Sequence, residues 1–168
     1  QGPNGPVPTK FLPAAICCEI VANPPYPETR MSFDSTAAHY APHAQALLRI
    51  VCGYLFVVHG SMKLFHVPHA AMFDGVTLMS LMGLAGVLEL VGGVLLILGL
   101  FTRIVAFVLS GEMAAAYFMA HASHGNPLFP QLNQGEAAVL FCFAFLFLAA
   151  AGSGAWSLDG ARAQGRRH

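Results

Sequence analysis

Long apolar runs separated by short polar segments dominate the chain from residue 46 onward. The runs are continuous and lack the strict alternation of a half-buried β-strand. Four of them are long enough to cross a hydrocarbon core of ~30 Å as helices, since a helix rises ~1.5 Å per residue. The predicted spans are residues 46–65, 76–100, 102–121 and 137–156. This pattern predicts an all-α integral membrane protein built as a four-helix bundle.

The connections between the spans also carry signals. The second and third spans meet at GLFTR, where Gly99 suits a helix end and Thr102 suits an N-cap. This predicts a tight helical hairpin. The last loop ends in Asn133-Gln134-Gly135-Glu136, the spacing of an N-cap followed by a carboxylate three residues later.

Small residues recur in the predicted spans, where helices could meet. They either allow close backbone approach in a bundle or reflect the general tolerance of membrane helices for glycine. These positions are Gly53, Gly60, Gly83, Gly86, Gly92, Gly93, Gly111 and Ala115.

The segments outside the spans differ in character. Residues 1–45 are expected to form an irregular N-terminal extension, and residues 32–45 within it a loop or an interfacial helix. Residues 1–30 are rich in proline, and Met31 is a candidate start, which would leave those thirty residues outside the native chain. Residues 160–168 form a basic tail. The predicted membrane domain is therefore 46–159.

Basic residues flank the spans unevenly. Lys63 stands alone on one side, and five arginines flank the spans on the other. Basic residues favour the cytoplasmic side, so the pattern predicts a multi-pass protein of the bacterial inner membrane with both termini in the cytoplasm. The arginines are Arg49, Arg103, Arg162, Arg166 and Arg167. Arg49 and Lys63 are expected to extend towards lipid headgroups.

Composition excludes several classes of protein. Hydrophobic residues make up 56% of the 168 residues and charged residues only 10%, whereas soluble domains carry about 25% charged residues. The formal net charge is zero, so no nucleic-acid partner is expected. The four cysteines contain no C-x-x-C pair and are expected to pack as small hydrophobic residues.

Two carboxylates inside the spans are the main functional signal. Glu89 and Glu112 lie roughly 18 Å and 14 Å from the outer ends of their predicted helices. An ionised carboxylate at such a depth is costly unless it is paired, neutral or open to a polar cavity. The hairpin brings the two glutamates together, which favours a shared proton, a proton relay or a bond to a quinone head group. The alternative is a purely structural role between helices.

Further candidate ligands lie near the outer end of the first span. His59 and Lys63 are four residues apart and share one helix face. If that face points inward, Lys63 can neutralise Glu112 or Glu136, and His59 can bond a carboxylate or a ligand. Glu136 also has a structural explanation as a carboxylate at a helix N-terminus. No metal site is expected at the outer ends of the spans, because the histidines there show no H-x-x-x-H spacing and no E-x-x-H motif occurs.

Four segments of the chain together resemble the DoxX family of small membrane proteins. They are LLRIVCGYLFVVHGSMKLF, LELVGGVLLILGLFTR, NPLFPQLNQGEAAVLF and GSGAWSLD, in that order. The family pattern N-G-G-E near the fourth span is N-Q-G-E here. The resemblance implies a four-helix membrane bundle associated with redox systems. It places the polar family residues at His59, Lys63, Glu89 and Glu136, whereas Glu112 rests on its position in the span.

These observations lead to two main hypotheses. In the first, the protein is a subunit of a quinone-linked redox complex, such as a quinol oxidase, and its polar residues bind a quinone head group or pass protons. The chain shows no flavin, haem or iron–sulfur motif of its own, so no cofactor is expected from its motifs, and the resemblance together with the carboxylate pair makes a quinone the candidate ligand. In the second, it is a non-catalytic subunit that stabilises a larger membrane complex. The expected partners are lipid and other membrane subunits; transport is disfavoured, because four spans are few and broken-helix pairs are absent.

Overall fold

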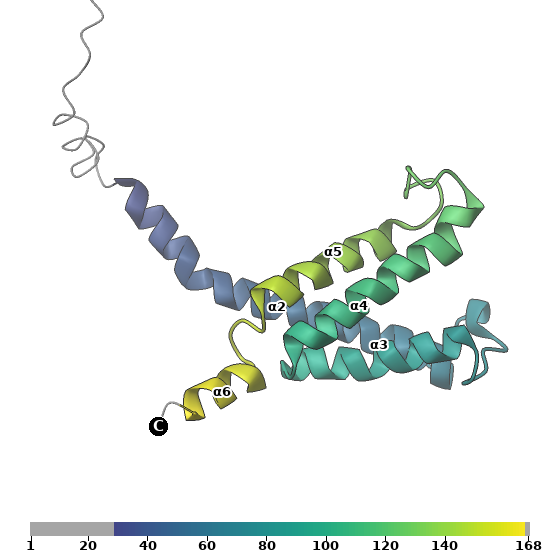
Figure 1. Ribbon diagram of the computed structural model, residues 1–168, viewed down its shortest axis with the longest axis horizontal. Helices are drawn as coiled ribbons and strands as arrows, with labels where there is room; N and C mark the ends of the chain where they lie inside the picture. The colour runs from purple at the N-terminus through teal and green to yellow at the C-terminus, as the bar shows by residue number, and fades with distance from the viewer. Residues whose placement is uncertain (1–28, 167–168) are drawn as a thin grey trace, which may run out of the picture. The chain divides into compact units, whose positions relative to one another are not determined.

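The computed structural model describes residues 29–166, and within this range the chain is helical without a β-strand (Figure 1). A 3₁₀ turn, Ala71–Phe73, lies between α2 and α3, and α4 continues as a π-helical turn, Tyr117–His121. The all-α prediction is confirmed. The α-helices are α2 (Thr29–Phe65), α3 (Leu81–Leu98), α4 (Thr102–Ala116), α5 (Glu136–Ala151) and α6 (Leu158–Gly165).

The chain divides into two compact units, residues 1–37 and 38–168. Within the first unit, the described residues form the beginning of α2. Residues 29–45 belong to α2, so of the two alternatives for residues 32–45, a loop or a helix, the structure shows the helix. The predictions for residues 1–28 lie outside the described residues.

Three helical segments are long and apolar enough to cross a membrane: Ser35–Phe65, Leu81–Leu98 and Thr102–His121. The fourth predicted span is represented by the shorter apolar helix α5. Two predicted boundaries are wrong. Residues 76–80 form turns before α3, and the chain leaves the helix after Ala151, so Trp156 lies beyond the end of α5.

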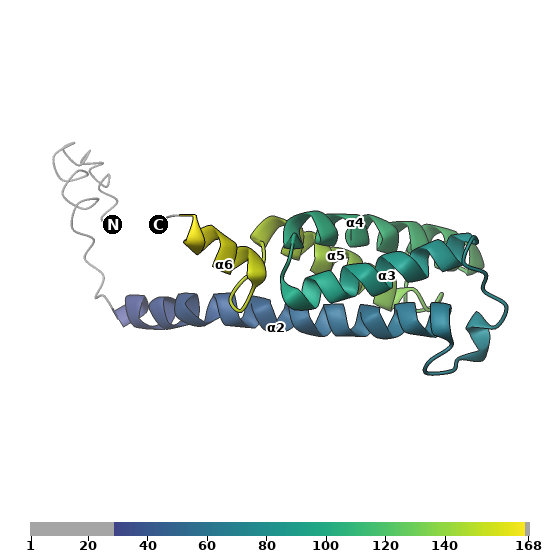
Figure 2. The same ribbon diagram turned by 90° about the horizontal axis from the view of Figure 1, so that it is seen from below.

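The core of the second unit lies where α2, α3, α4 and α5 meet (Figure 2). Phe56 of α2 packs edge-to-face on Phe145 and Phe141 of α5, with ring centroids 4.6 Å and 5.1 Å apart. Such aromatic pairs contribute beyond the area that they bury. The buried cluster consists of Cys52, Phe56, Leu96, Ala106, Leu109, Met113, Phe145 and Leu148.

Glycines bring the backbones of α2 and α3 into direct contact. A Cβ atom on Gly53 would lie 2.8 Å from the carbonyl oxygen of Gly93, and one on Gly60 would lie 2.6 Å from the backbone nitrogen of Leu90. Close approach is therefore the reason for glycine at these positions. At Gly111 in α4 a Cβ would meet nothing within 4 Å, so general tolerance explains that glycine.

The turn between α3 and α4 is capped from a distant part of the chain. Gly99 ends α3 in the left-handed conformation, with φ 65°, as its sequence position predicted. Thr102 is not the N-cap, because α4 begins at Thr102 and Phe101 occupies the cap position. Asp159 of α6 supplies the missing acceptor. Its carboxylate accepts hydrogen bonds from the backbone N–H groups of Phe101 at 3.0 Å and Thr102 at 2.9 Å.

Two arginines satisfy helix C-termini at the same end of the unit. Arg49 is fully buried and donates to the carbonyl oxygens of Leu96 at 2.9 Å and Trp156 at 2.8 Å. Arg103 donates to the last carbonyls of α5, Ala149 and Ala150. The carbonyls of Leu96, Ala149 and Ala150 belong to the last turns of α3 and α5, where carbonyl groups carry partial negative charge, whereas Trp156 lies in the segment between α5 and α6. The expectation that Arg49 extends towards lipid headgroups is therefore wrong.

We predict that Gly60→Ala destabilises the bundle, whereas Gly111→Ala does not. The added methyl group at Gly60 meets backbone atoms of α3, which cannot rotate away, so overpacking should cost about 1–3 kcal/mol. Gly111 faces open space, and alanine gains up to about 1 kcal/mol in helix propensity there. Thermal unfolding of the purified protein in mild detergent measures both. An equal loss of stability in the two variants would contradict this account of the α2–α3 contact.

We also predict that Asp159 makes stability acid-sensitive. Burial alone would raise the pKa of Asp159, but the N–H groups of Thr102 and Phe101 outweigh it and hold the pKa below its usual range. Its contribution is therefore present above the unfolded pKa and lost as the pH falls through the folded value, between about pH 5 and pH 3. Asp159→Asn should flatten the fall in melting temperature over this range. Asp74→Asn, at an exposed carboxylate, is the control and should keep the full acid sensitivity.

Candidate functional site

A buried ion pair joins α2 to α3. The Nζ atom of Lys63 lies 2.6 Å from Oε1 of Glu89, and the two residues are only 8% and 3% exposed. Gly86 makes this possible, because a Cβ there would lie 3.0 Å from the Cβ of Lys63. Lys63 lies two residues before the end of α2, whereas Glu89 lies mid-way along α3, roughly 12 Å from Leu81. The lysine side chain thus reaches inward from the helix end.

Glu112 of α4 lies beside this pair. Both of its carboxylate oxygens are buried and have no hydrogen-bond partner among the described residues, and Oε2 of Glu89 is likewise unpartnered. Glu112 interacts electrostatically with Glu89 and Lys63, which places the three charges in one cluster. A buried polar group without a partner is costly, so Glu112 is the member of the cluster that is open to a proton or a ligand.

An aromatic side chain from the loop before α3 covers the pair. The ring of Phe73 is buried, and its centroid lies 5.7 Å from Nζ of Lys63, a cation–π contact. In the same loop, Nε2 of His69 lies 3.0 Å from Oδ1 of Asp74, and both side chains are exposed. Sequence reasoning missed Phe73. The available signal was the one aromatic side chain of the segment between the first two helices, residues 66–80.

His59 does not join the cluster, so the expectation that it faces inward is wrong. Its side chain is exposed and makes no hydrogen bond with another described residue. The reason is helical geometry. Gly60 forms the contact with α3, and each residue is turned ~100° from its neighbour. His59 therefore points away from α3, while the longer side chain of Lys63 reaches Glu89.

Glu136 is also separate from the cluster. It is the first residue of α5, it is exposed, and Gly135 rather than Asn133 occupies the N-cap position. Asn133 instead is buried and accepts the N–H of Gly135 at 2.9 Å. Lys63 pairs with Glu89 and not with Glu136 or Glu112. Glu136 acts here at a helix N-terminus, where its charge is favourable.

Metal ligation receives no support from the geometry. Across residues 29–166, no three side chains of His, Cys, Asp or Glu converge in a way that could hold an ion. Nδ1 of His121 instead lies 3.2 Å from the backbone oxygen of Asn133. The candidate site therefore consists of Lys63, Glu89 and Glu112, covered by Phe73.

Comparison with known proteins identifies the family. The DoxX family model matches residues 44–122. An uncharacterized protein of Haemophilus influenzae is 47% identical over 127 residues, covering 71% of this chain and 91% of the relative. The chain belongs to the DoxX family. No solved structure matches it.

The matched region of this DoxX protein contains the whole charged cluster. Lys63, Glu89 and Glu112 all lie between residues 44 and 122, whereas Glu136 lies outside the match. Family membership and the three long apolar helices together identify a membrane protein. Its lipid-facing surface consists of the exposed apolar side chains of these helices.

We predict that the Lys63–Glu89 pair acts as a unit in stability. Lys63→Met or Glu89→Gln alone leaves one buried charge unpaired and should cost about 3–5 kcal/mol. The double variant removes both charges and should recover most of this loss. The exposed His69–Asp74 pair is the matched control, and its disruption should cost at most about 1 kcal/mol. Thermal unfolding in detergent measures all of these variants. Additive losses in the Lys63–Glu89 double variant would show that the two charges do not stabilise each other.

Proposed function

We propose that this DoxX protein is a four-span subunit of a quinone-linked redox complex in the bacterial inner membrane, with both termini in the cytoplasm. In this proposal Glu112 bonds the quinone head group and passes protons, beside the Lys63–Glu89 pair. The observation that carries the proposal is a carboxylate in the middle of an apolar helix whose two oxygens are buried and unpartnered. Such intramembrane carboxylates characteristically mark ligand sites and proton relays.

The residues fit a quinone head group. Glu112 in its protonated form can donate to a carbonyl oxygen, and in its ionised form it can accept from a hydroxyl group. Lys63 neutralises Glu89, so the site needs no further cation to hold a neutral ligand. A bound quinone would supply two-electron chemistry coupled to protons, and the electrons would pass to or from a partner subunit.

The position of the cluster suits proton exchange with the outer side. Glu112 lies near the middle of its helix, roughly 15 Å from Thr102 and 14 Å from His121. Lys63 lies near the end of α2, so the cluster extends from mid-helix to the loop that carries Phe73. Phe73 shields the charges from the surroundings of that loop. In this proposal Glu112 holds the proton, and the Lys63–Glu89 pair fixes the electrostatic environment in which it does so.

The proposed topology accommodates the short fourth helix. With 16 residues, α5 is ~24 Å long, less than the ~30 Å of a hydrocarbon core. Residues 152–156 continue the segment towards exposed Trp156, a residue type that anchors at membrane interfaces. Arg162 and Arg166 follow in an exposed position, as expected for a cytoplasmic tail.

A specific observation favours a second function, that of a non-catalytic subunit stabilising a larger membrane complex. His59 is a polar residue exposed within an apolar helix, a position that suits contact with another membrane protein better than contact with lipid. Substitution of His59 and Glu112 separates the two functions. Loss of complex assembly in His59→Leu favours the stabilising role, whereas loss of turnover with intact assembly in Glu112→Gln favours the redox role.

We predict that Glu112→Gln weakens binding of a prenylated benzoquinone to the purified protein in nanodiscs by about two- to tenfold, because the O–H of protonated Glu112 donates to a quinone carbonyl, a neutral hydrogen bond contributes about 0.5–1.5 kcal/mol, and an amide N–H is a weaker donor. Glu136→Gln makes the same chemical change at an exposed carboxylate outside the cluster, and it should leave the dissociation constant unchanged. The bound quinone is quantified by mass spectrometry after titration. Failure of the unmodified protein to bind the quinone, or equal affinity in Glu112→Gln, would contradict the proposal.

A further inference from the structure

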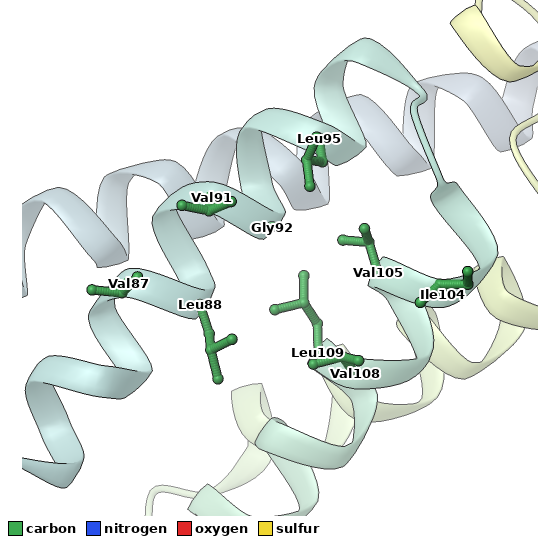
Figure 3. Close-up of a pocket in the computed structure, with 9 residues that line it drawn as sticks. All are labelled: Val87, Leu88, Val91, Gly92, Leu95, Ile104, Val105, Val108 and Leu109. Atoms are coloured by element: carbon green, nitrogen blue, oxygen red, sulfur yellow. The ribbon is translucent and has the colours of Figure 1, made fainter.

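An apolar groove runs along the seam between α3 and α4 (Figure 3). Leu88 and Leu95 of α3 face Val105 and Leu109 of α4 across it. The groove has a volume of about 240 Å³. The complete lining is Val87, Leu88, Val91, Gly92, Leu95, Ile104, Val105, Val108 and Leu109.

Gly92 lets Leu109 of α4 pack closely against α3 at the floor of the groove. The δ-carbons of Leu109 lie 3.0 Å from where a Cβ of Gly92 would stand, so these two buried residues form the floor. The rim is exposed: Val91 is 52% and Val108 46% exposed. In a membrane this rim faces hydrocarbon, so a ligand can enter sideways from the lipid.

The floor of the groove leads to the charged cluster. Gly92 lies three residues after Glu89, and Leu109 lies three residues before Glu112. Residues three apart on a helix are neighbours on one face. The glutamates therefore lie about one helical turn beyond the floor, on the faces of α3 and α4 that meet. The hydrocarbon-lined groove and the unpartnered carboxylate are parts of one continuous seam.

We propose that this groove holds the isoprenoid tail of a quinone whose head group bonds Glu112. The inference rests on the proposed function and adds the path of the tail. A volume of about 240 Å³ is below the 300–1,000 Å³ of sites that enclose a whole small ligand. The groove therefore takes part of a ligand, and its apolar lining selects a hydrocarbon part.

Depth favours a quinone over a phospholipid as the occupant. The head group must reach Glu112 in the middle of α4, where a charged phosphate would be expensive. A quinone head is neutral, carries hydrogen-bonding oxygens and is attached directly to a hydrocarbon chain. A quinone can therefore place its chain in the apolar groove and bond Glu112 with its head group, whereas the acyl chain of a phospholipid would leave Glu112 without a partner.

The test compares a benzoquinone carrying a long isoprenoid tail with the same head group carrying a methyl group instead. Val91→Phe places a ring on the rim of the groove, and Val94→Phe is the matched control on the same helix, exposed to a similar degree at 43% but outside the lining. Val91→Phe should weaken binding of the tailed quinone about tenfold, the change that 1.4 kcal/mol of lost packing produces. Binding of the tail-less head group should be unchanged, and Val94→Phe should affect neither.

Other outcomes overturn the inference in distinguishable ways. If Val91→Phe leaves the tailed quinone unaffected while Glu112→Gln still weakens it, the tail lies elsewhere and the proposed function stands. If neither quinone binds the unmodified protein, the proposed function itself fails. Should Val91→Phe not fold, Val108→Phe tests the opposite rim. A photoreactive group at the end of the tail gives a second readout, and it should label peptides from α3 and α4. Equal labelling by a photoreactive acyl chain on a phospholipid would assign the groove to ordinary lipid.

Discussion

The contact between α2 and α3 is the constraint on which the candidate site depends. Glycines at positions 53, 60 and 93 let the two backbones touch, and this places Lys63 against Glu89 at 2.6 Å. A buried charge pair of this kind contributes little net stability compared with apolar packing, but its disruption leaves a costly unpaired charge. The ion pair therefore specifies which faces of α2 and α3 meet and at what register, and it sets the electrostatic field around Glu112.

Much of this fold follows from the sequence, because hydropathy alone reports which segments avoid water. The helix ends follow less well. The predicted spans extend past the real ends of α3 and α5, because Ser80 caps the start of α3 with its side chain and Gly152 ends α5 at a positive φ of 98°. The meeting of Glu89 and Glu112 was predictable from the hairpin at Gly99. The sequence did not predict that Lys63 joins the cluster and His59 does not. This depends on which side of α2 packs against α3, and that is set by the tertiary glycine contact.

The arginines show why counting basic residues is a weaker argument than it first appears. Arg49 and Arg103 donate to helix C-terminal carbonyls, so packing explains their positions without reference to the membrane. Asp159 belongs to the same end of the unit and accepts from the N-terminus of α4. At one end of the unit, charged side chains therefore hydrogen-bond the backbone groups of helix termini. From a single sequence, such charges cannot be distinguished from those that mark the cytoplasmic side of a membrane protein.

The two glutamates divide the tasks of the cluster. Glu89 is compensated by Lys63 at 2.6 Å, so this carboxylate already has a charged partner. Glu112 has no such partner among the described residues, and a change in its protonation state or a new hydrogen bond breaks no existing contact. Of two such groups, the one that exchanges protons or releases a ligand has to be the one with fewer existing contacts to break. In the proposed function, Glu112 is therefore the group that bonds the ligand, and the groove along the α3–α4 seam holds the ligand's hydrocarbon part.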